Sequence, residues 1–192
     1  SEEELIKEAF YIEDIQNDKV TVFVEGETDE QYFNKALQLF YPDNTTLVFK
    51  WIGRKIAKDK AENTGDKALN NARSLFMAHP TFIVNKVVLL YDCDTNKPEE
   101  NNAKLFIRCM ARNSLNIMYN KGSENLLVLP SIFDYQSYYS TITRKDEYGA
   151  KSTICNLDKT KLCDYLCGLP ENDLKLIFAN FKNEIDKILS IK

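Results

Sequence analysis

The chain has 192 residues, of which 44% are hydrophobic and 28% charged, and its formal net charge is −4. This length fits one domain, or one domain with an appendage, and the composition is ordinary for a globular protein. The acidic balance argues mildly against a protein that coats nucleic acid without specificity, but it does not exclude a nucleic-acid enzyme whose acids hold cations. No apolar run of the roughly 18 residues that a membrane span needs and no signal sequence are found, and the five scattered cysteines suit a reducing compartment. We therefore expect a cytoplasmic protein without membrane attachment.

The first part of the chain predicts half of a βαβ unit. Residues 2–11 have the apolar spacing of a short helix, and we assign residues 1–17 to this N-terminal helix. Residues 20–24 are an apolar run that predicts a buried strand, which ends in Glu25 and Gly26. A glycine at this point lets the backbone turn sharply and approach a ligand.

The helix expected after this turn has an N-terminal signal of its own. Thr28 can cap it, with Gln31 as the third residue of a capping box. Asp29 would lie in the first turn, where an acid favourably opposes the helix dipole. A functional role for Asp29 depends instead on its closeness to Glu25.

A basic stretch follows the next predicted strand, residues 46–53, and precedes a predicted helix at 66–77. We expect an exposed loop there, with the cations Arg54, Lys55, Lys58 and Lys60. Such charge runs are most often solvated surface, and the alternative is a loop that contacts phosphates.

The central stretch of the chain, residues 86–96, is an apolar run that ends in two acids, Asp92 and Asp94. The run predicts a strand buried on both faces of a parallel sheet. If the backbone stays extended, both carboxylates point to the same side, about 6 to 7 Å apart along the strand. A cation between them would offset their repulsion. The alternative is a solvated Asp-rich turn.

The remaining elements are a helix at 101–113 and a fourth strand at 114–120, after which Lys121 and Glu124 lie in a polar cluster. Beyond Pro130 an aromatic, polar segment precedes two helical stretches, 158–167 and 171–190. We expect residues 131–192 to form a helical extension packed on an α/β domain of residues 18–130.

Three motifs resemble those of the TOPRIM domain, the fold shared by topoisomerases, bacterial primases and OLD-family nucleases. The segment VFVEGETDEQYF is similar to the family's strand-Glu-Gly element, and VVLLYDCDTN to its strand-DxD element about 65 residues later. KGSENLL resembles a third acidic element of OLD-like members, and the EGxxD pattern points the same way. The resemblance implies an α/β, Rossmann-like TOPRIM fold with about four mainly parallel strands flanked by helices.

The resemblance also implies a function, that of a metal-dependent nuclease that hydrolyses DNA or RNA. Catalysis is expected from Glu25, Asp92 and Asp94, which would bind metal together with Asp29 and Glu124. Carboxylate oxygens without nitrogen or sulfur ligands suit Mg²⁺ or Mn²⁺, and metals held in this way suit displacement at phosphorus. The residues expected to contact nucleic acid are Arg54, Lys55, Lys58 and Lys121.

Departures from the family leave several alternatives open. The chain has no P-loop ATPase module, which OLD proteins carry, so we expect a small TOPRIM nuclease that acts alone, is part of a longer chain, or works with a partner ATPase as in bacterial anti-phage systems. A second hypothesis is a non-catalytic module that binds metal or nucleic acid. A third is a haloacid-dehalogenase phosphatase, which the adjacent position of Thr95 disfavours. The choice between DNA and RNA and the oligomeric state stay open.

Overall fold

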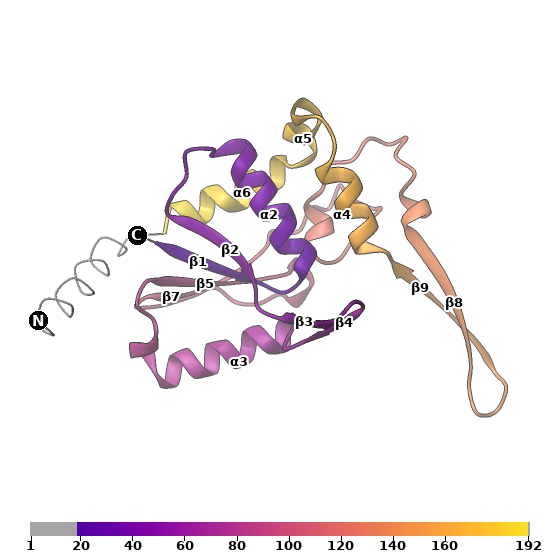
Figure 1. Ribbon diagram of the computed structural model, residues 1–192, viewed down its shortest axis with the longest axis horizontal. Coiled ribbons are helices and arrows are strands. Elements are labelled where there is room, and N and C mark those ends of the chain that lie inside the picture. Colours follow the sequence, from indigo (N-terminus) through magenta and orange to yellow (C-terminus); the bar gives the residue numbers. More distant parts are fainter. Residues whose placement is uncertain (1–18, 192) are drawn as a thin grey trace, which may run out of the picture.

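A five-stranded sheet forms the centre of the protein in the computed structural model, which describes residues 19–191 (Figure 1). The strands lie in the order β2 (Leu47–Trp51), β1 (Val20–Val24), β5 (Lys86–Tyr91), β7 (Leu105–Cys109) and β6 (Glu100–Asn102). The first four are parallel, and β6 runs antiparallel to β7. The helix predicted at 2–11 lies outside the described residues.

Helices cover both faces of this sheet (Figure 1). One face packs against α3 (Gly65–Ala78), and the other against α2 (Glu27–Phe40) and the C-terminal helices α4 (Lys159–Cys167), α5 (Glu171–Ile177) and α6 (Ala179–Leu189). Strand β5 has buried side chains on both faces: Val88 and Leu90 face the α2 layer, and Val87 and Leu89 face α3. This burial explains its continuous apolar run. The α/β class and the mostly parallel sheet are as predicted.

The helix predicted at 101–113 is wrong. This stretch contains β6, a tight turn and β7. Leu105 and Ile107 pack on the α3 side, whereas Phe106 packs on the α2 side, so a continuous apolar triplet is buried as a central strand. A short apolar run of this kind cannot be distinguished from a buried helical turn by its spacing alone.

The strand predicted at 114–120 is also wrong, because this segment is an irregular loop. Leu115 and Ile117, which would have supplied the apolar face, are 90% and 88% exposed. The loop is organised by Asn116, whose Nδ2 donates to the carbonyl oxygens of residues 124, 125 and 127 and whose Oδ1 accepts from the amides of residues 118 and 119. One partly buried amide side chain thus organises the backbone of this loop.

Two hairpins that the sequence pattern did not predict extend from the domain (Figure 1). The basic stretch expected as a loop forms β3 (Arg54–Ala57) and β4 (Lys60–Glu62), and the polar segment after Pro130 contains β8 (Tyr139–Lys145) and β9 (Lys151–Leu157). Residues 131–192 are therefore not wholly helical. The helical stretch expected at 171–190 is divided at Phe178 into α5 and α6.

Four short 3₁₀ segments complete the described chain: η1 (Pro80–Phe82), η2 (Cys93–Thr95), η3 (Ser123–Leu126) and η4 (Tyr135–Tyr138). Two of them lie at motifs noted in the sequence: η2 begins directly after Asp92 and contains Asp94, and η3 begins directly after Gly122. Within residues 19–191 no helix has both the length and the apolar character to cross a membrane.

Candidate functional site

Glu25 and Asp92 lie side by side because each directly follows one of two adjacent parallel strands, β1 and β5. Parallel strands end at the same edge of a sheet, which is where ligands bind in open α/β folds. The Oε1 atom of Glu25 accepts a hydrogen bond of 2.9 Å from the backbone amide of Asp92. Glu25 thereby fixes the start of the turn that carries both aspartates.

Asp29 caps its own helix. The amide of Gly26, the N-cap residue of α2, donates to Asp29 Oδ2 at 2.7 Å, so the predicted capping of this helix by Thr28 and Gln31 is wrong. The other oxygen, Oδ1, accepts from the hydroxyl of Ser123. Asp29 is 2% exposed, and its two hydrogen bonds link the β1–α2 turn to η3.

Asp92 and Asp94 do not share one face of an extended strand. The chain leaves the extended conformation after Asp92 and enters η2, where the amide and the hydroxyl of Thr95 both donate to the carbonyl oxygen of Asp92. Asp92 is 8% exposed, whereas Asp94 lies on the surface, with its Oδ1 accepting a bond of 3.0 Å from the amide of Gly122. The expectation of a same-side pair fails because the turn begins between them.

Gly122 is the residue around which the acids from different segments meet. Its φ of +66° and ψ of −170° belong to a region that only glycine readily adopts. A Cβ here would lie 2.6 Å from Glu124 Oε2 and 3.7 Å from Asp92 Oδ2. The absence of a side chain therefore gives these two carboxylates their room. Glu124 reaches this position from η3 and not, as predicted, from the end of a fourth strand.

Lys159 is a member of the site that the sequence did not indicate. It is the first residue of α4, and its position is fixed by Asp158, whose side chain caps that helix by accepting from the amide of Lys161 at 3.0 Å. The ammonium Nζ of Lys159 lies 3.3 Å from Glu124 Oε2. Two lysines flank one threonine in this stretch, and nothing in the pattern distinguishes the one that turns inward.

The electrostatics of the cluster disfavour several negative charges at once. Burial, reinforced by the carboxylates of Asp29 and Glu25, raises the pKa of Asp92 to about 9. Burial is also the largest cause of the raised pKa values of Glu25, Asp29 and Glu124. Burial disfavours the charged form of Lys159, but the surrounding carboxylates, Glu124 foremost, raise its pKa above the ordinary value.

Three buried carboxylate oxygens of the cluster have no hydrogen-bond partner. They are Oδ1 of Asp92 and both oxygens of Glu124, and only the ion pair with Lys159 compensates one of them. Buried polar groups are normally paired, so unpaired ones indicate strain or a missing ligand. The fully buried Asn125 beside them is different, because its Oδ1 accepts from Asn113 and its Nδ2 donates to Asn113 and Tyr119.

In the part of the chain that the structure describes, no group of three or more His, Cys, Asp and Glu side chains is arranged to hold a metal ion. The present contacts of the acids explain why they do not form a ready-made metal site. Glu25, Asp29 and Asp94 each turn an oxygen towards a backbone amide, and Lys159 lies beside Glu124. A cation would share these oxygens with their present hydrogen-bond donors or bind through the second oxygen of the carboxylate.

The predicted nucleic-acid contacts lie on the surface, and half of them are engaged with acids. Arg54 forms an ion pair with Glu62 across the β3–β4 hairpin, and Lys55 lies 3.0 Å from Glu27. Lys58 and Lys121 are exposed. The hairpin lies near the acids, since the hydroxyl of residue 64 and the amide of residue 65, just after β4, donate to the carbonyl oxygen of residue 25.

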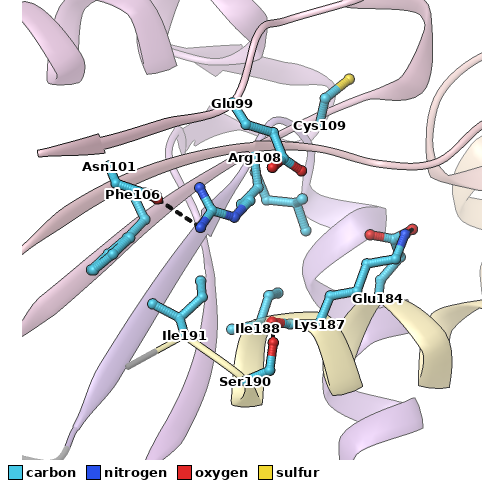
Figure 2. Close-up of a pocket in the computed structure, with 11 residues that line it drawn as sticks. Glu99, Asn101, Phe106, Arg108, Cys109, Glu184, Lys187, Ile188, Ser190 and Ile191 are labelled. Atoms are coloured by element: carbon cyan, nitrogen blue, oxygen red, sulfur yellow. Dashed lines mark hydrogen bonds and ion pairs between the residues drawn. The ribbon is translucent and has the colours of Figure 1, made fainter.

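A separate cavity of about 410 Å³ lies between α6 and strands β6 and β7 (Figure 2). Its charged side chains are mostly satisfied: Arg108 donates to Asn101 at 2.8 Å, and Lys187 pairs with Glu184 at 3.1 Å. None of the five acids named above lines it. This cavity is therefore not part of the acid cluster.

These features define the protein as an α/β chain with an acid cluster at the carboxyl ends of its parallel strands. In comparisons with known proteins, no family model, no curated protein and no solved structure matches the chain. The function is therefore argued from the residues of the site and from the sequence motifs.

Proposed function

We propose that this chain is a divalent-metal-dependent nuclease of the TOPRIM type, most similar in its motifs to the OLD family, acting alone or with a partner ATPase. The observation that carries the proposal is a set of buried carboxylate oxygens without hydrogen bonds, Oδ1 of Asp92 and both oxygens of Glu124, of which only Glu124 Oε2 has a counter-ion. Ionised carboxylates without partners are costly to bury. A divalent cation would supply both the missing partner and the missing positive charge.

The donor set suits a hard cation. Asp92, Glu124 and Glu25 would hold it first, with Asp29 and Asp94 as further ligands, and all five offer oxygen only, the chemistry that Mg²⁺ and Mn²⁺ prefer. When bound, such ions polarise a phosphoryl oxygen and make water a stronger nucleophile at neutral pH. The proposed substrates are the phosphodiester bonds of DNA or RNA.

The chain's own groups have definable tasks in this proposal. Gly122 lets the backbone pass close to Asp92, Glu124 and Lys159, because a Cβ at this position would lie 3.7 Å or less from a side-chain atom of each. The side chain of Lys159 is 48% exposed, and its ammonium lies beside the buried carboxylate of Glu124. A cation in that position can neutralise the acids in the resting protein and contact a phosphate oxygen when substrate is bound.

A second candidate function is a non-catalytic binding module. It is favoured by the Lys159–Glu124 ion pair, which already places one positive charge in the cluster, and by the lack of a ready-made metal site within residues 19–191. In this case Lys159 would be a permanent counter-ion, and metal would bind weakly or not at all.

The test is a cleavage assay of the full chain on single- and double-stranded DNA and on RNA, with Mg²⁺, Mn²⁺ or EDTA. A phosphomonoester substrate is included to detect a phosphatase. Asp92→Asn is the site variant, and Asp43→Asn, which removes an exposed acid on the α2–β2 connection, is the matched control. We expect metal-dependent cleavage of nucleic acid that is lost in the first variant and kept in the second. Binding of nucleic acid without cleavage, and without a rise in melting temperature on addition of metal, would favour the binding module instead.

A further inference from the structure

The hairpin β8–β9 is an exposed two-stranded ribbon that extends away from the domain (Figure 1). Its strands pair in unbroken register from Tyr139 with Leu157 to Lys145 with Lys151, and every residue of both strands except Leu157 is exposed. Seven residues per strand give a length of roughly 24 Å. A two-stranded ribbon that packs on the described chain only at its base is marginally stable by itself, which favours a partner that covers it.

Charge on the ribbon indicates what kind of molecule that is. The two strands carry three cations, Arg144, Lys145 and Lys151, and no acid. Lys145 and Lys151 are direct cross-strand partners, although like charges in that arrangement repel. Neither of them forms an ion pair with any described residue. An anionic partner would remove this repulsion.

The face of the ribbon that carries Lys145 and Lys151 is rich in hydroxyl groups. Thr141 and Thr143 lie on the same face of β8 as Lys145, because every second residue of a strand points to the same side, and Thr143 is paired with Thr153 on β9. Lysine and threonine side chains are common donors to phosphate oxygens. The only acids of the hairpin lie in its tip turn, where Asp146 is occupied by the amides of residues 148 and 150.

The base of the ribbon is tied to the candidate site. The amide of Asp158 donates to the carbonyl oxygen of Tyr138 at 2.7 Å and closes the hairpin, and the rings of Tyr119 and Tyr139 lie 6.0 Å apart. Strand β9 ends only two residues before Lys159, which contacts Glu124. The ribbon therefore starts at the rim of the acid cluster.

We propose that the β8–β9 hairpin is an arm that binds the backbone of duplex DNA and holds it beside the acid cluster. The inference rests on the proposed nuclease function for its choice of a nucleic-acid partner, and it narrows the substrate to double-stranded DNA. A two-stranded ribbon fits the major groove of B-form DNA, about 12 Å wide, whereas the major groove of duplex RNA is deep and narrow. The arm's length matches roughly seven base pairs at about 3.4 Å each.

The test measures equilibrium binding of the full chain to a fluorescent DNA duplex of about 20 base pairs over a range of salt concentrations. EDTA is present so that no cleavage occurs. The arm variant is Lys145→Ala with Lys151→Ala. The control is Lys50→Ala with Lys175→Ala, which removes the same charge from exposed positions on β2 and α5. Melting curves establish that both variants fold.

Loss of two phosphate contacts should reduce the salt slope of log K by about 2 and weaken binding roughly 60-fold at 0.1 M salt, provided that the affinity at 1 M salt is unchanged. The control should bind like the parent. Equal slopes for the arm variant and the control would overturn the inference. So would stronger parent binding to duplex RNA than to duplex DNA, or a dimer that only the arm variant loses in sedimentation.

A parallel cleavage assay of the parent with Mg²⁺ or Mn²⁺ separates this inference from the proposed function. Binding of DNA that depends on the arm, without any cleavage, would support the inference about the arm and contradict the proposed nuclease function. Metal-dependent cleavage with no contribution of the arm to binding would support the nuclease function and contradict the inference about the arm.

Discussion

The ammonium of Lys159 lies 3.3 Å from a carboxylate oxygen of Glu124, and the two side chains differ greatly in exposure, at 48% and 1%. The buried partner depends on this contact, because neither of its oxygens has a hydrogen bond. The half-exposed partner can leave the contact more easily. In the proposed function, Lys159 is therefore the group that a metal ion would replace beside Glu124.

Replacing Lys159 with Met should destabilise the metal-free protein. Breaking a fully buried ion pair costs about 3 to 5 kcal/mol, and solvent screening of a half-exposed lysine lowers the expected loss to about 1 to 2 kcal/mol. Lys161→Met, an exposed lysine on the same helix, is the control and should cost less than about 0.5 kcal/mol. Urea unfolding at neutral pH measures both. Equal losses would show that the pair with Glu124 contributes nothing specific.

Asp92→Asn should leave the metal-free protein as stable as the parent or more stable, because a neutral amide replaces a carboxyl whose ionised form is disfavoured by burial and by its acidic neighbours. Metal at five times its dissociation constant should stabilise the parent by about 1 kcal/mol, or about 2 to 4 °C in melting temperature. The Asn variant should lose most of this increment. If it instead loses roughly 2 kcal/mol or more without metal, Asp92 is a structural residue and its catalytic role is wrong.

The stability of the metal-free protein should fall as the pH rises. The pKa of Asp92 is raised from 3.8 to about 9, so the folded protein keeps a proton that the unfolded chain has lost between these values. Rising pH therefore favours the unfolded chain, by up to about 1.4 kcal/mol per pH unit for one group. Melting temperatures measured from about pH 5 to pH 8 should decrease in the parent, and the decrease should be smaller in Asp92→Asn. A parent curve that rises over this range would contradict the raised pKa.

Gly122→Ala and Gly149→Ala separate crowding from backbone strain. Both glycines have positive φ, +66° and +82°, but a Cβ at Gly122 would collide with Glu124, whereas nothing lies within 4 Å at Gly149. We expect a loss of about 1 kcal/mol at Gly149, from the backbone alone, and of about 3 kcal/mol or more at Gly122. Thermal unfolding of the two variants measures the difference. Equal losses would mean that Glu124 moves aside without cost.

The sequence by itself determined the elements whose pattern is local and repeated. The apolar runs at 20–24 and 86–91 formed the central parallel strands, and the helices expected near 28–40 and 66–77 are present with shifted ends. Neighbouring parallel strands end at the same edge, so Glu25 and Asp92 could be expected to lie close together once these two strands pair. The pairing itself joins residues about 66 apart in the sequence.

Local patterns did not determine the elements that lie between the strands. Leu105 to Ile107 can be buried in a helix or in a strand. They form a strand because β5 and β6 provide hydrogen-bonding partners on both sides. The segment 114–120 has apolar residues at strand spacing, but the side chain of Asn116 bonds to two amides of its own loop and to the carbonyl oxygens of residues 124 and 127. Such choices depend on which partners are available in space.

The same distinction holds for the candidate site. The five acids were proposed as candidate ligands from their places in the sequence motifs, whereas their geometry could not be predicted. Gly122 and Lys159 reach the cluster from segments about 30 and 67 residues after Asp92, and a lysine among several in sequence acquires a role only when a helix places it against a buried carboxylate. Charge pairing over such separations is decided by tertiary packing, because nothing in the local sequence records which groups will be buried together.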